Sequence, residues 1–226
     1  MAPKHQALLI AFFIQETLNV LGRQGEQIII KAICEYGEGR GKRMANKALK
    51  DGRKNDLLSF LLYGEIEWSD TGNKFKIAQR KPFFRVNAQK CFWHEIWTKN
   101  NMQEVGRIYC QDIDRAIMKG FNPDLNFDVP QNMNDGSSHC VFNYRDWRLE
   151  FFDLIKFVFK KRKAKKKAVE PWSFHCIDVY EKFSNVIIRE AGEDGKPIID
   201  KVTKRFTEEF GEAATIFLTS AESIQV

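Results

Sequence analysis

The feature that most constrains this chain is a pattern that occurs twice, once near each end. Residues 5–31 and 175–201 align without a gap, and seven of the 27 aligned positions are identical. The identities include both glycines of a Gly-x-x-Gly pattern, Gly22 and Gly25 in the first copy. Glycine readily takes the backbone conformations at which a helix ends. The repeat therefore predicts a helical hairpin at each end of the chain, and we expect the hairpins to pack against each other or to form a dimer face.

The sequence between the hairpins is typical of a small antiparallel sheet. Apolar and polar residues partly alternate there, and turn-rich runs such as "SDTGN" and "QNMNDGSS" separate the segments. We expect strands at 65–68, 74–79, 83–87, 125–129 and 139–145, with helices at 91–99 and 102–119 among them. Three helices, at 148–168, 173–191 and 196–218, are expected to end the chain.

These elements predict an α+β fold, an antiparallel sheet flanked by helical hairpins. We expect an α+β domain over residues 1–147 and a C-terminal helical extension over 148–226, packed on the same domain. Apolar residues make up 43% of the 226 positions, which is enough for a sizeable core. The apolar stretch at 7–14 is too short to span a membrane and lacks the cleavage site of a signal peptide. Five scattered cysteines do not suggest a disulfide framework, so we expect a cytoplasmic protein.

The net charge of +6 is concentrated in one segment. "KKRKAKKK" at 160–167 carries seven Lys or Arg, so the rest of the chain sums to −1 (6 minus 7). This pattern indicates the solvated end of a helix, or a segment attracted to anionic lipid or RNA. No RNA-recognition aromatic motif accompanies it, so we expect no specific nucleic-acid partner.

The stretch "YCQDIDRAIMKGFNPDLNF" at 109–127 holds the first candidate site residues. Cys110 and Asp114 lie one helical turn apart and share a face. Because a carboxylate raises the pKa of a neighbouring thiol, Asp114 would not activate Cys110 by charge. A cation or a base would be needed, and His94, His139, Arg40 and Arg43 are the candidates. The alternative is a buried cysteine that only packs.

Two other motifs carry weaker signals. "GEGRGKR" at 37–43 fails as a phosphate loop, because its spacing is one residue short and no Ser or Thr follows the lysine. Arg40 and Arg43 in it are spaced to clamp a carboxylate, or to be plain surface arginines. The pairs "CFWH", "HC" and "HC" are too loosely spaced to predict a zinc site, and we expect no metal and no cofactor.

The combination of motifs over residues 5–145 resembles the L-2-amino-thiazoline-4-carboxylic acid hydrolase family. The resemblance rests on "C-x-W-x3-W" from Cys91, "G-x2-YC-x3-D-x5-GFNP-x-L" from Gly106, "G-x3-C-x-F" from Gly136, and "RGKRMA" from Arg40. The motif "G-x3-C-x-F" also resembles one in the small-ligand-binding domains of the vinyl-reductase and TRAPP type. The family resemblance implies hydrolytic opening of a cyclic amidine-like C–S linkage to an N-carbamoyl-cysteine product.

The matching motif positions, together with the nearby histidines, suggest a set of site residues and a hypothetical mechanism. Those expected in catalysis are Cys110, Asp114, Tyr109 and His139, and those expected to bind substrate are Arg40, Arg43, Trp93, His94, Asn122 and Cys140. In this hypothesis Asp114 acts on the amidine, and water or Cys110 attacks the ring carbon. Tyr109 or His139 then protonates the departing sulfur, while Arg43 holds the carboxylate.

Two other functions fit the same sequence. One is a non-catalytic module that binds a small ligand in the same pocket, which we expect between the helix at 103–119 and the strand at 139–145. The other is an interaction or membrane-surface protein that uses the basic segment at 160–167. A homodimer is compatible with all three.

Overall fold

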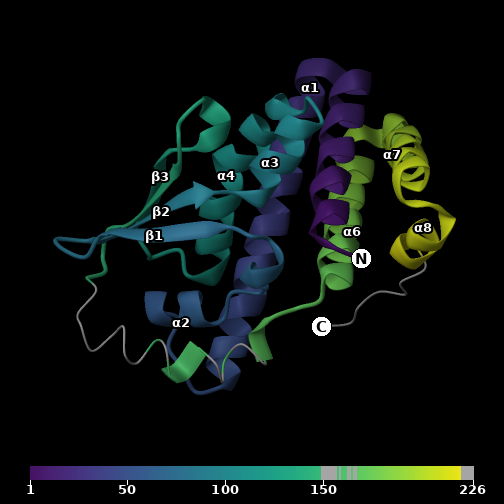
Figure 1. Cartoon of the computed structure of the whole chain (residues 1–226). Helices are drawn as coiled ribbons and strands as arrows, with labels where there is room; N and C mark the ends of the chain where they lie inside the picture. The colour runs from purple at the N-terminus through teal and green to yellow at the C-terminus, as the bar shows by residue number, and fades with distance from the viewer. Residues whose placement is uncertain (149–156, 158, 162–163, 165–166, 220–226) are drawn as a thin grey trace. The chain divides into compact units, whose positions relative to one another are not determined.

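The computed structural model describes residues 1–148, 157, 159–161, 164 and 167–219 (Figure 1). The chain divides into two compact units. The first is built from residues 1–36, 95–109 and 171 onward, and the second from 37–94 and 110–170. The helix expected at 148–168 lies mostly outside the described residues.

The first unit consists of helices, and both predicted hairpins lie in it. Helix α1 (Pro3–Lys50) is interrupted at Gly22, where φ is 54° and ψ is −127°. Helix α6 (Trp172–Ala191) ends at Gly192 with φ 59° and ψ −123°. The short helix η3 (Gly192–Asp194) and helix α7 (Gly195–Phe210) follow. The two glycines have nearly the same left-handed backbone, which confirms the repeated hairpin.

The second glycine of each pattern is required by close packing. A Cβ atom on Gly25 would lie 2.5 Å from the carbonyl oxygen of Thr17, and one on Gly195 would lie 2.7 Å from the Cα of Ile188. Real Cβ atoms do not approach backbone atoms so closely. In the Gly-x-x-Gly pattern, the first glycine therefore allows a positive φ, and the second allows close packing of the backbone.

The hairpins pack against each other around equivalent positions of the repeat. Phe13 and Phe183, which align in the repeat, have ring centroids 5.4 Å apart, and both side chains are fully buried. The apolar run at 7–14 is buried throughout, and the Ala7 carbonyl accepts a hydrogen bond of 2.9 Å from the indole Nε1 of Trp97. Trp97 lies on helix α3 (Phe92–Lys99). The mutual packing of the hairpins was one of the two expected arrangements, and a dimer face stays a prediction.

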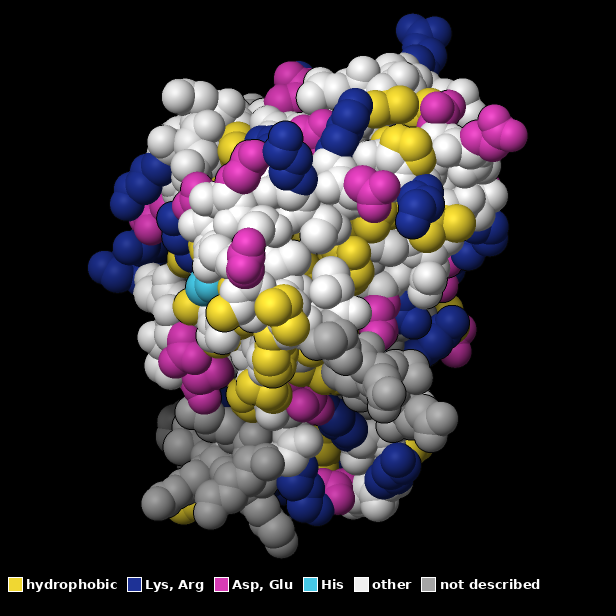
Figure 2. Space-filling model, turned by 90° about the vertical axis from the view of Figure 1, so that its right-hand side faces the viewer, with side chains coloured by type: hydrophobic (Ala, Val, Ile, Leu, Met, Phe, Trp, Pro, Cys, Tyr) yellow, Lys and Arg dark blue, Asp and Glu magenta, His cyan; other side chains and the backbone are white. Residues whose placement is uncertain are grey.

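Ion pairs connect the two hairpins at the surface of this unit. Ion pairs join Lys31 to Glu190 at 2.7 Å and Arg205 to Glu16 at 2.6 Å, in both cases between the two hairpins. Figure 2 shows the resulting mixture of basic and acidic side chains on one face, with hydrophobic side chains among them. The helix expected at 196–218 is in fact two. It is broken at Gly211, where φ is 84°, and helix α8 (Glu212–Thr219) follows.

The second unit contains a four-stranded antiparallel sheet. Strands β1 (Lys74–Gln79), β2 (Phe84–Lys90), β3 (Phe127–Gln131) and β4 (Cys140–Tyr144) are arranged in the order β1-β2-β4-β3. These strands confirm four of the five that were expected; the ends of β1 coincide with the prediction, and those of the other three differ by one to three residues. The α+β fold class is confirmed as well.

The fifth expected strand, at 65–68, is wrong. Residues Trp68–Asp70 form a short 3-10 helix, and Glu65 is buried in an ion cluster. Helix α2 (Leu57–Leu62), which begins at its N-cap Asp56, precedes this segment. The alternation of acidic and apolar residues in "EIEW" is typical of a strand. Here, however, Glu65 is buried because it forms ion pairs with Arg40, Arg43 and Lys47.

Helix α4 (Gln103–Phe121) is held close to the C-terminal part of α1 by small residues. A Cβ atom on Gly37 would lie 2.6 Å from the Cβ of Ala116, and atoms added at Gly41 or Gly120 would overlap the opposite backbone. Gly37 and Gly41 of "GEGRGKR" therefore serve a helix crossing. This crossing fixes the position of the α4 residues that follow Tyr109.

Candidate functional site

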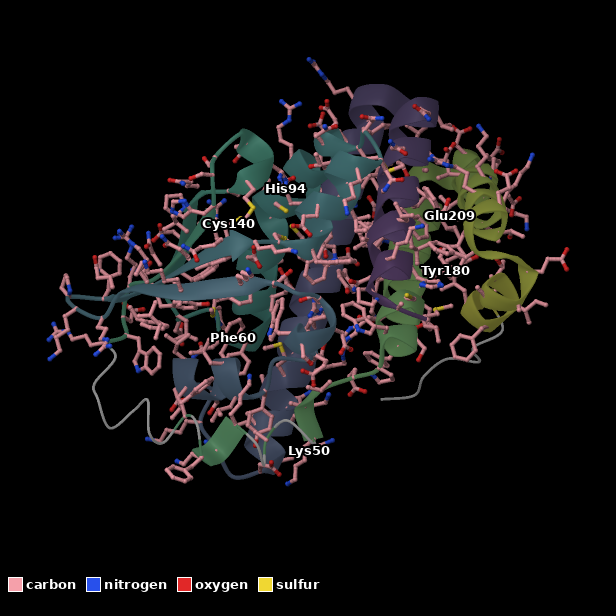
Figure 3. The ribbon with its side chains drawn as sticks, in the orientation of Figure 1. Lys50, Phe60, His94, Cys140, Tyr180 and Glu209 are labelled. Atoms are coloured by element: carbon pink, nitrogen blue, oxygen red, sulfur yellow. The ribbon has the colours of Figure 1, made fainter. Side chains whose placement is uncertain are left out.

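Cys110 and Asp114 occupy successive turns of α4, as their spacing predicted, and both keep partial contact with solvent. The Cys110 Sγ accepts a hydrogen bond of 3.1 Å from the Nδ2 of Asn134. The Oδ1 of Asn134 in turn lies 2.8 Å from the Nδ1 of His94. The amide of Asn134 thus links the imidazole to the thiol in one polar chain. Figure 3 labels His94, at one end of this chain, and Cys140.

The turn that carries Asn134 is fixed by its own side chains. Asn134 lies in the 3-10 helix η2 (Met133–Asp135) between β3 and β4. The Oδ1 of Asn132 accepts hydrogen bonds from the backbone N–H groups of Asn134 and Asp135, at 2.8 and 3.1 Å. Gly136 closes the turn with a φ of 87°. These contacts fix the conformation of the turn that carries Asn134.

Two further thiols lie near Cys110. The Sγ of Cys140 accepts a hydrogen bond of 3.4 Å from the N–H of Met133, and Cys91 packs against the small apolar cluster that contains both. Burial raises the pKa of Cys110 well above its ordinary value, and Cys91, Asp114 and Cys140 raise it further. Burial also raises the pKa of Cys140 to about 12. Both thiols are therefore protonated at neutral pH.

Asp114 has a higher pKa than an ordinary surface carboxylate. Burial raises the pKa of Asp114 from 3.8 to about 6, and the positive charges of Arg40 and Arg115 oppose the rise. Burial, together with the charge of Asp114, raises the pKa of Tyr144 on strand β4. Asp114 therefore exchanges a proton close to neutral pH, beside an uncharged tyrosine.

A hollow of about 160 Å³ lies next to these residues. Met118, one turn beyond Asp114 on α4, forms one wall, and Tyr144 and Phe127 of the sheet form another. Asp56 and Asp146 lie at the same hollow, and each accepts a backbone hydrogen bond, from Ser59 at 2.9 Å and from Asn126 at 2.7 Å. Met118 of the helix and Tyr144 of the strand thus line a mostly apolar hollow, but Cys110 and Asp114 are not among its lining residues. A pocket that contains the candidate site residues stays a prediction.

Arg40 and Arg43 converge on one buried carboxylate. Glu65 has no exposed side-chain surface, and Arg43 binds it with two hydrogen bonds of 3.1 and 3.2 Å. The Nε of Arg40 lies 3.5 Å from its Oε2, and the Nζ of Lys47 lies 3.8 Å from its Oε1. Burial would raise the pKa of Glu65, but the three cations outweigh it and hold the pKa below its usual value. A substrate carboxylate would have to compete with Glu65 for Arg43.

Residues 3–144 match the family model described as L-2-amino-thiazoline-4-carboxylic acid hydrolase. This chain belongs to that family. The matched range contains Arg40, Cys110, Asp114 and Asn134 and ends at Tyr144, the last residue of β4. No curated protein and no solved structure matches the chain, so the likeness to vinyl-reductase and TRAPP-type domains stays a prediction.

The remaining expected site residues have contacts of their own. Tyr109 belongs to the first unit, where its ring packs edge-on to Trp97 at 5.6 Å. Asn122 ends α4, donating to the Asn55 carbonyl at 2.7 Å and accepting from the N–H of Asp124 at 3.0 Å. These contacts give both residues a packing or turn role.

Trp93 and His139 also have neighbours of their own. The Trp93 ring lies edge-on to Trp68 at 6.2 Å, and the Nδ1 of His139 lies 3.0 Å from the Oγ of Ser138. The catalytic and binding roles of these four residues stay predictions. The structure instead brings together Cys110, Asp114, His94 and Cys140. The positive charge of Arg40 acts on Asp114 and lowers its pKa.

Sequence reasoning missed Asn134 and Tyr144. Asn134 was interpreted only as part of a turn, and the "N-x-N-D-G" spacing that lets Asn132 cap the turn was the available signal. Tyr144 reaches the site through the register of the sheet, which no local motif encodes.

Two general properties complete the description. Across the described part of the chain, no helix has the length and hydropathy that a membrane span requires. The same residues contain no group of three or more His, Cys, Asp or Glu side chains placed to hold a metal ion.

Proposed function

We propose that this protein is a hydrolase that opens the ring of 2-amino-thiazoline-4-carboxylate or a closely related cyclic amidine. The family supplies the reaction type. The observation that carries the assignment is Asp114, a partly exposed carboxyl group with a pKa of about 6. It lies one helical turn before Met118 and acts on the pKa of Tyr144, and both of these residues line the hollow. A group with such a pKa can take up and release a proton at neutral pH.

Asp114 is the general base in this proposal. Its carboxylate takes a proton from a water molecule, whose oxygen attacks the amidine carbon between the sulfur and the two nitrogens. A tetrahedral intermediate forms, and its C–S bond breaks with the electron pair remaining on sulfur. The second proton of the water moves to the ring nitrogen as the carbonyl group forms, and the proton held by Asp114 passes to the departing thiolate. The product is therefore an N-carbamoyl-cysteine. One molecule of water is consumed and the carboxyl group returns to its starting state.

Cys110 is assigned a supporting role. Its raised pKa leaves little thiolate at neutral pH, and its sulfur accepts a hydrogen bond from neutral Asn134. Protein thiols that act as nucleophiles have lowered pKa values. Water is therefore the attacking group, and the polar chain of His94, Asn134 and Cys110 helps to shape the wall of the site.

The substrate carboxylate is assigned to the positive field of Arg40 and Arg43. These residues and Lys47 carry three positive charges, against the two negative charges of Glu65 and of Glu170, which binds Lys47. The surplus attracts an anion, although the hydrogen bonds of Arg43 are already engaged. We also propose that the protein acts in the cytoplasm, where its five free thiols would stay reduced.

A small-ligand-binding module is the second candidate, and one observation favours it. The hollow beside Tyr144 is mostly apolar, as is usual for sites that retain a ligand. Such a module would keep a ligand through purification, and native mass spectrometry of the intact protein would detect it. A hydrolase would convert its substrate instead.

The test is turnover of 2-amino-thiazoline-4-carboxylate by the purified protein, followed by thiol release and mass spectrometry of the product. We expect Asp114→Asn to lower kcat by about 10²–10⁴-fold, the usual contribution of a general base. Cys110→Ala is expected to keep most of the activity. Asp112→Asn on the same helix is the matched control and is expected to be unaffected. Full activity of Asp114→Asn would exclude Asp114 as the base, and loss of activity in Cys110→Ala alone would support a covalent route.

A further inference from the structure

The hairpin of β1 and β2 carries a positive charge that no carboxylate within it offsets. Residues 71–90 contain six Lys or Arg and no Asp or Glu; the six are Lys74, Lys76, Arg80, Lys81, Arg85 and Lys90. On the hairpins of the first unit, by contrast, ion pairs such as Lys31–Glu190 connect the charges. Among the described residues, no carboxylate forms an ion pair with Lys74, Lys76 or Arg80. The charges of Lys74, Lys76 and Arg80 are therefore available to a partner.

Strand β1 is at the edge of the sheet. The strand order is β1-β2-β4-β3, so β1 pairs with β2 on one side only within the described residues. Five of its six residues are exposed, and the sixth is half-buried. An edge strand offers unpaired N–H and C=O groups to another extended chain. Strand β3, at the other edge, differs because Pro130 removes a backbone donor.

The two faces of β1 have different chemistry. Phe75 and Ile77 lie opposite Ala88 and Val86, and both remain 40% or more exposed. Lys76, between them, points to the other face because side chains alternate along a strand. The ring of Trp68, itself 39% exposed, lies edge-on to Phe75 at 5.1 Å and extends the apolar face.

Lysines on an edge strand commonly prevent association of sheets. That role explains Lys74 and Lys76, but it does not explain why Phe75, Ile77 and Trp68 are exposed beside them. Repulsion of other chains requires only the lysines and does not require exposed apolar side chains. The combination instead selects for a strand that presents acidic side chains on one face and apolar side chains on the other.

Other occupants fit less well. A second copy of β1 would place lysines next to lysines, which is unfavourable for a pair of strands. A single-stranded nucleic acid needs cations for its phosphates and aromatic rings for its bases on one surface. Here Lys76 and the Phe75–Trp68 pair are on opposite faces. Neither occupant satisfies both faces at once.

We propose that β1 is a docking edge for an extended acidic segment of another protein. The segment adds to the sheet as a fifth strand, as in other complexes formed by strand addition. Its acidic residues lie beside Lys74 and Lys76, and its alternating apolar residues cover Phe75, Ile77 and Trp68. This site is separate from the proposed active site and does not depend on the hydrolase assignment.

The test uses the full chain and a fluorescein-labelled probe peptide of eight residues that alternates Asp or Glu with Val or Ile. Fluorescence anisotropy measures its binding. Three control peptides test the contributions of residue alternation, backbone hydrogen bonding and negative charge. The first has the same residues arranged in acidic and apolar blocks, the second is the alternating peptide with two central prolines, and the third has lysine in place of the acidic residues. We expect only the alternating acidic peptide to bind well, with an affinity that falls as salt rises.

Variants and hydrogen exchange locate the binding edge. We expect Lys76→Glu to weaken binding by about tenfold, because an attractive cross-strand pair becomes a repulsive one. Ile77→Lys is expected to weaken it as well, through the apolar face. Lys201→Glu, an exposed change in the first unit, is the control and is expected to bind like wild type. On binding, the amides of residues 74–79 should gain protection and those of 127–131 should not.

Three results would overturn the proposal. The first is no binding at millimolar peptide. The second is equal binding of the block peptide or of a single-stranded oligonucleotide of the same charge, which would show that charge alone acts. The third is peptide-independent dimerisation that Ile77→Lys abolishes, which would make a second copy of the chain the occupant.

Discussion

Glu65 and Asp114 are both carboxyl groups set into the second unit, and their pKa values are shifted in opposite directions. Glu65 is completely buried, yet its pKa is lowered, because Arg40, Arg43 and Lys47 surround it. Asp114 is only partly buried, yet its pKa is raised to about 6. Burial favours the protonated form of both groups, so the number and closeness of cations decide the outcome.

Arg40 makes the comparison sharper because it acts on both groups. It lies 3.5 Å from Glu65, and its charge also lowers the pKa of Asp114. Glu65 has Arg43 in bidentate contact, whereas Asp114 has no such partner among the described residues. One carboxylate is thus fixed as a structural anion and the other is left able to exchange a proton. This difference is what we expect between a stabilising group and a catalytic one.

The largest effect is expected when Glu65 is neutralised. Glu65→Gln leaves three cations around a neutral group, and breaking a buried ion pair in this way typically costs about 3–5 kcal/mol of the free energy of unfolding. Urea unfolding at neutral pH measures the loss. Glu67→Gln, two residues away, is the control and is expected to change stability by less than about 0.5 kcal/mol. A loss as small as the control's would mean that the cations do not depend on Glu65.

The next effect concerns Asp114 and has the opposite sign. Its pKa is about 6 in the folded chain and 3.8 in a free side chain, so the folded state binds more protons between these values. Stability therefore falls as pH rises from about 4 to 6 and stays low above this range. We expect Asp114→Asn, which cannot ionise, to be more stable than wild type by about 1–3 kcal/mol at pH 7.5. The advantage should disappear near pH 4.

Thermal unfolding of both proteins across this pH range gives the difference directly. Asp112→Asn is again the control, because Asp112 lies on the same helix. If Asp114→Asn were less stable than wild type at pH 7.5, Asp114 would be a stabilising anion like Glu65. The contrast between the two carboxyl groups would then be lost.

Part of this contrast could be predicted from the sequence. The spacing of Cys110 and Asp114 placed them on one helical face, and the charge argument gave the direction of the Cys110 pKa shift. Both follow from local rules, since neighbours on a helix are set by residue number. The two Gly-x-x-Gly hairpins were predictable for the same reason.

The rest depends on contacts between distant segments. Glu65 meets Arg43 across 22 residues, so "EIEW" has the pattern of a strand although Glu65 is an ion-cluster residue. Asn134 reaches Cys110 across 24 residues, through a turn whose position depends on the sheet. Tyr144 comes close to Asp114 only because β4 lies beside α4 in the fold. No local pattern encodes these three contacts.

A smaller effect is expected from the residue that the two carboxyl groups share. Arg40→Gln removes a positive charge that lowers the pKa of Asp114, so that pKa should rise by about one unit. Carboxyl carbon NMR with labelled aspartate measures it without relying on activity. If the protein is a hydrolase, the pH at half-maximal kcat should rise by the same amount. An unchanged Asp114 pKa would show that Arg40 serves Glu65 alone.

The smallest effect is expected at the solvent side of the ion cluster. Lys47 lies 2.5 Å from Glu170, and about a quarter of each side chain is exposed. Partly exposed ion pairs contribute little, so Glu170→Gln should cost about 0.5–1 kcal/mol, and less in high salt. The same urea unfolding measures it beside Glu65→Gln. If both variants lost equal stability, burial of Glu65 would not distinguish it, and the number of cations alone would explain why its pKa falls while that of Asp114 rises.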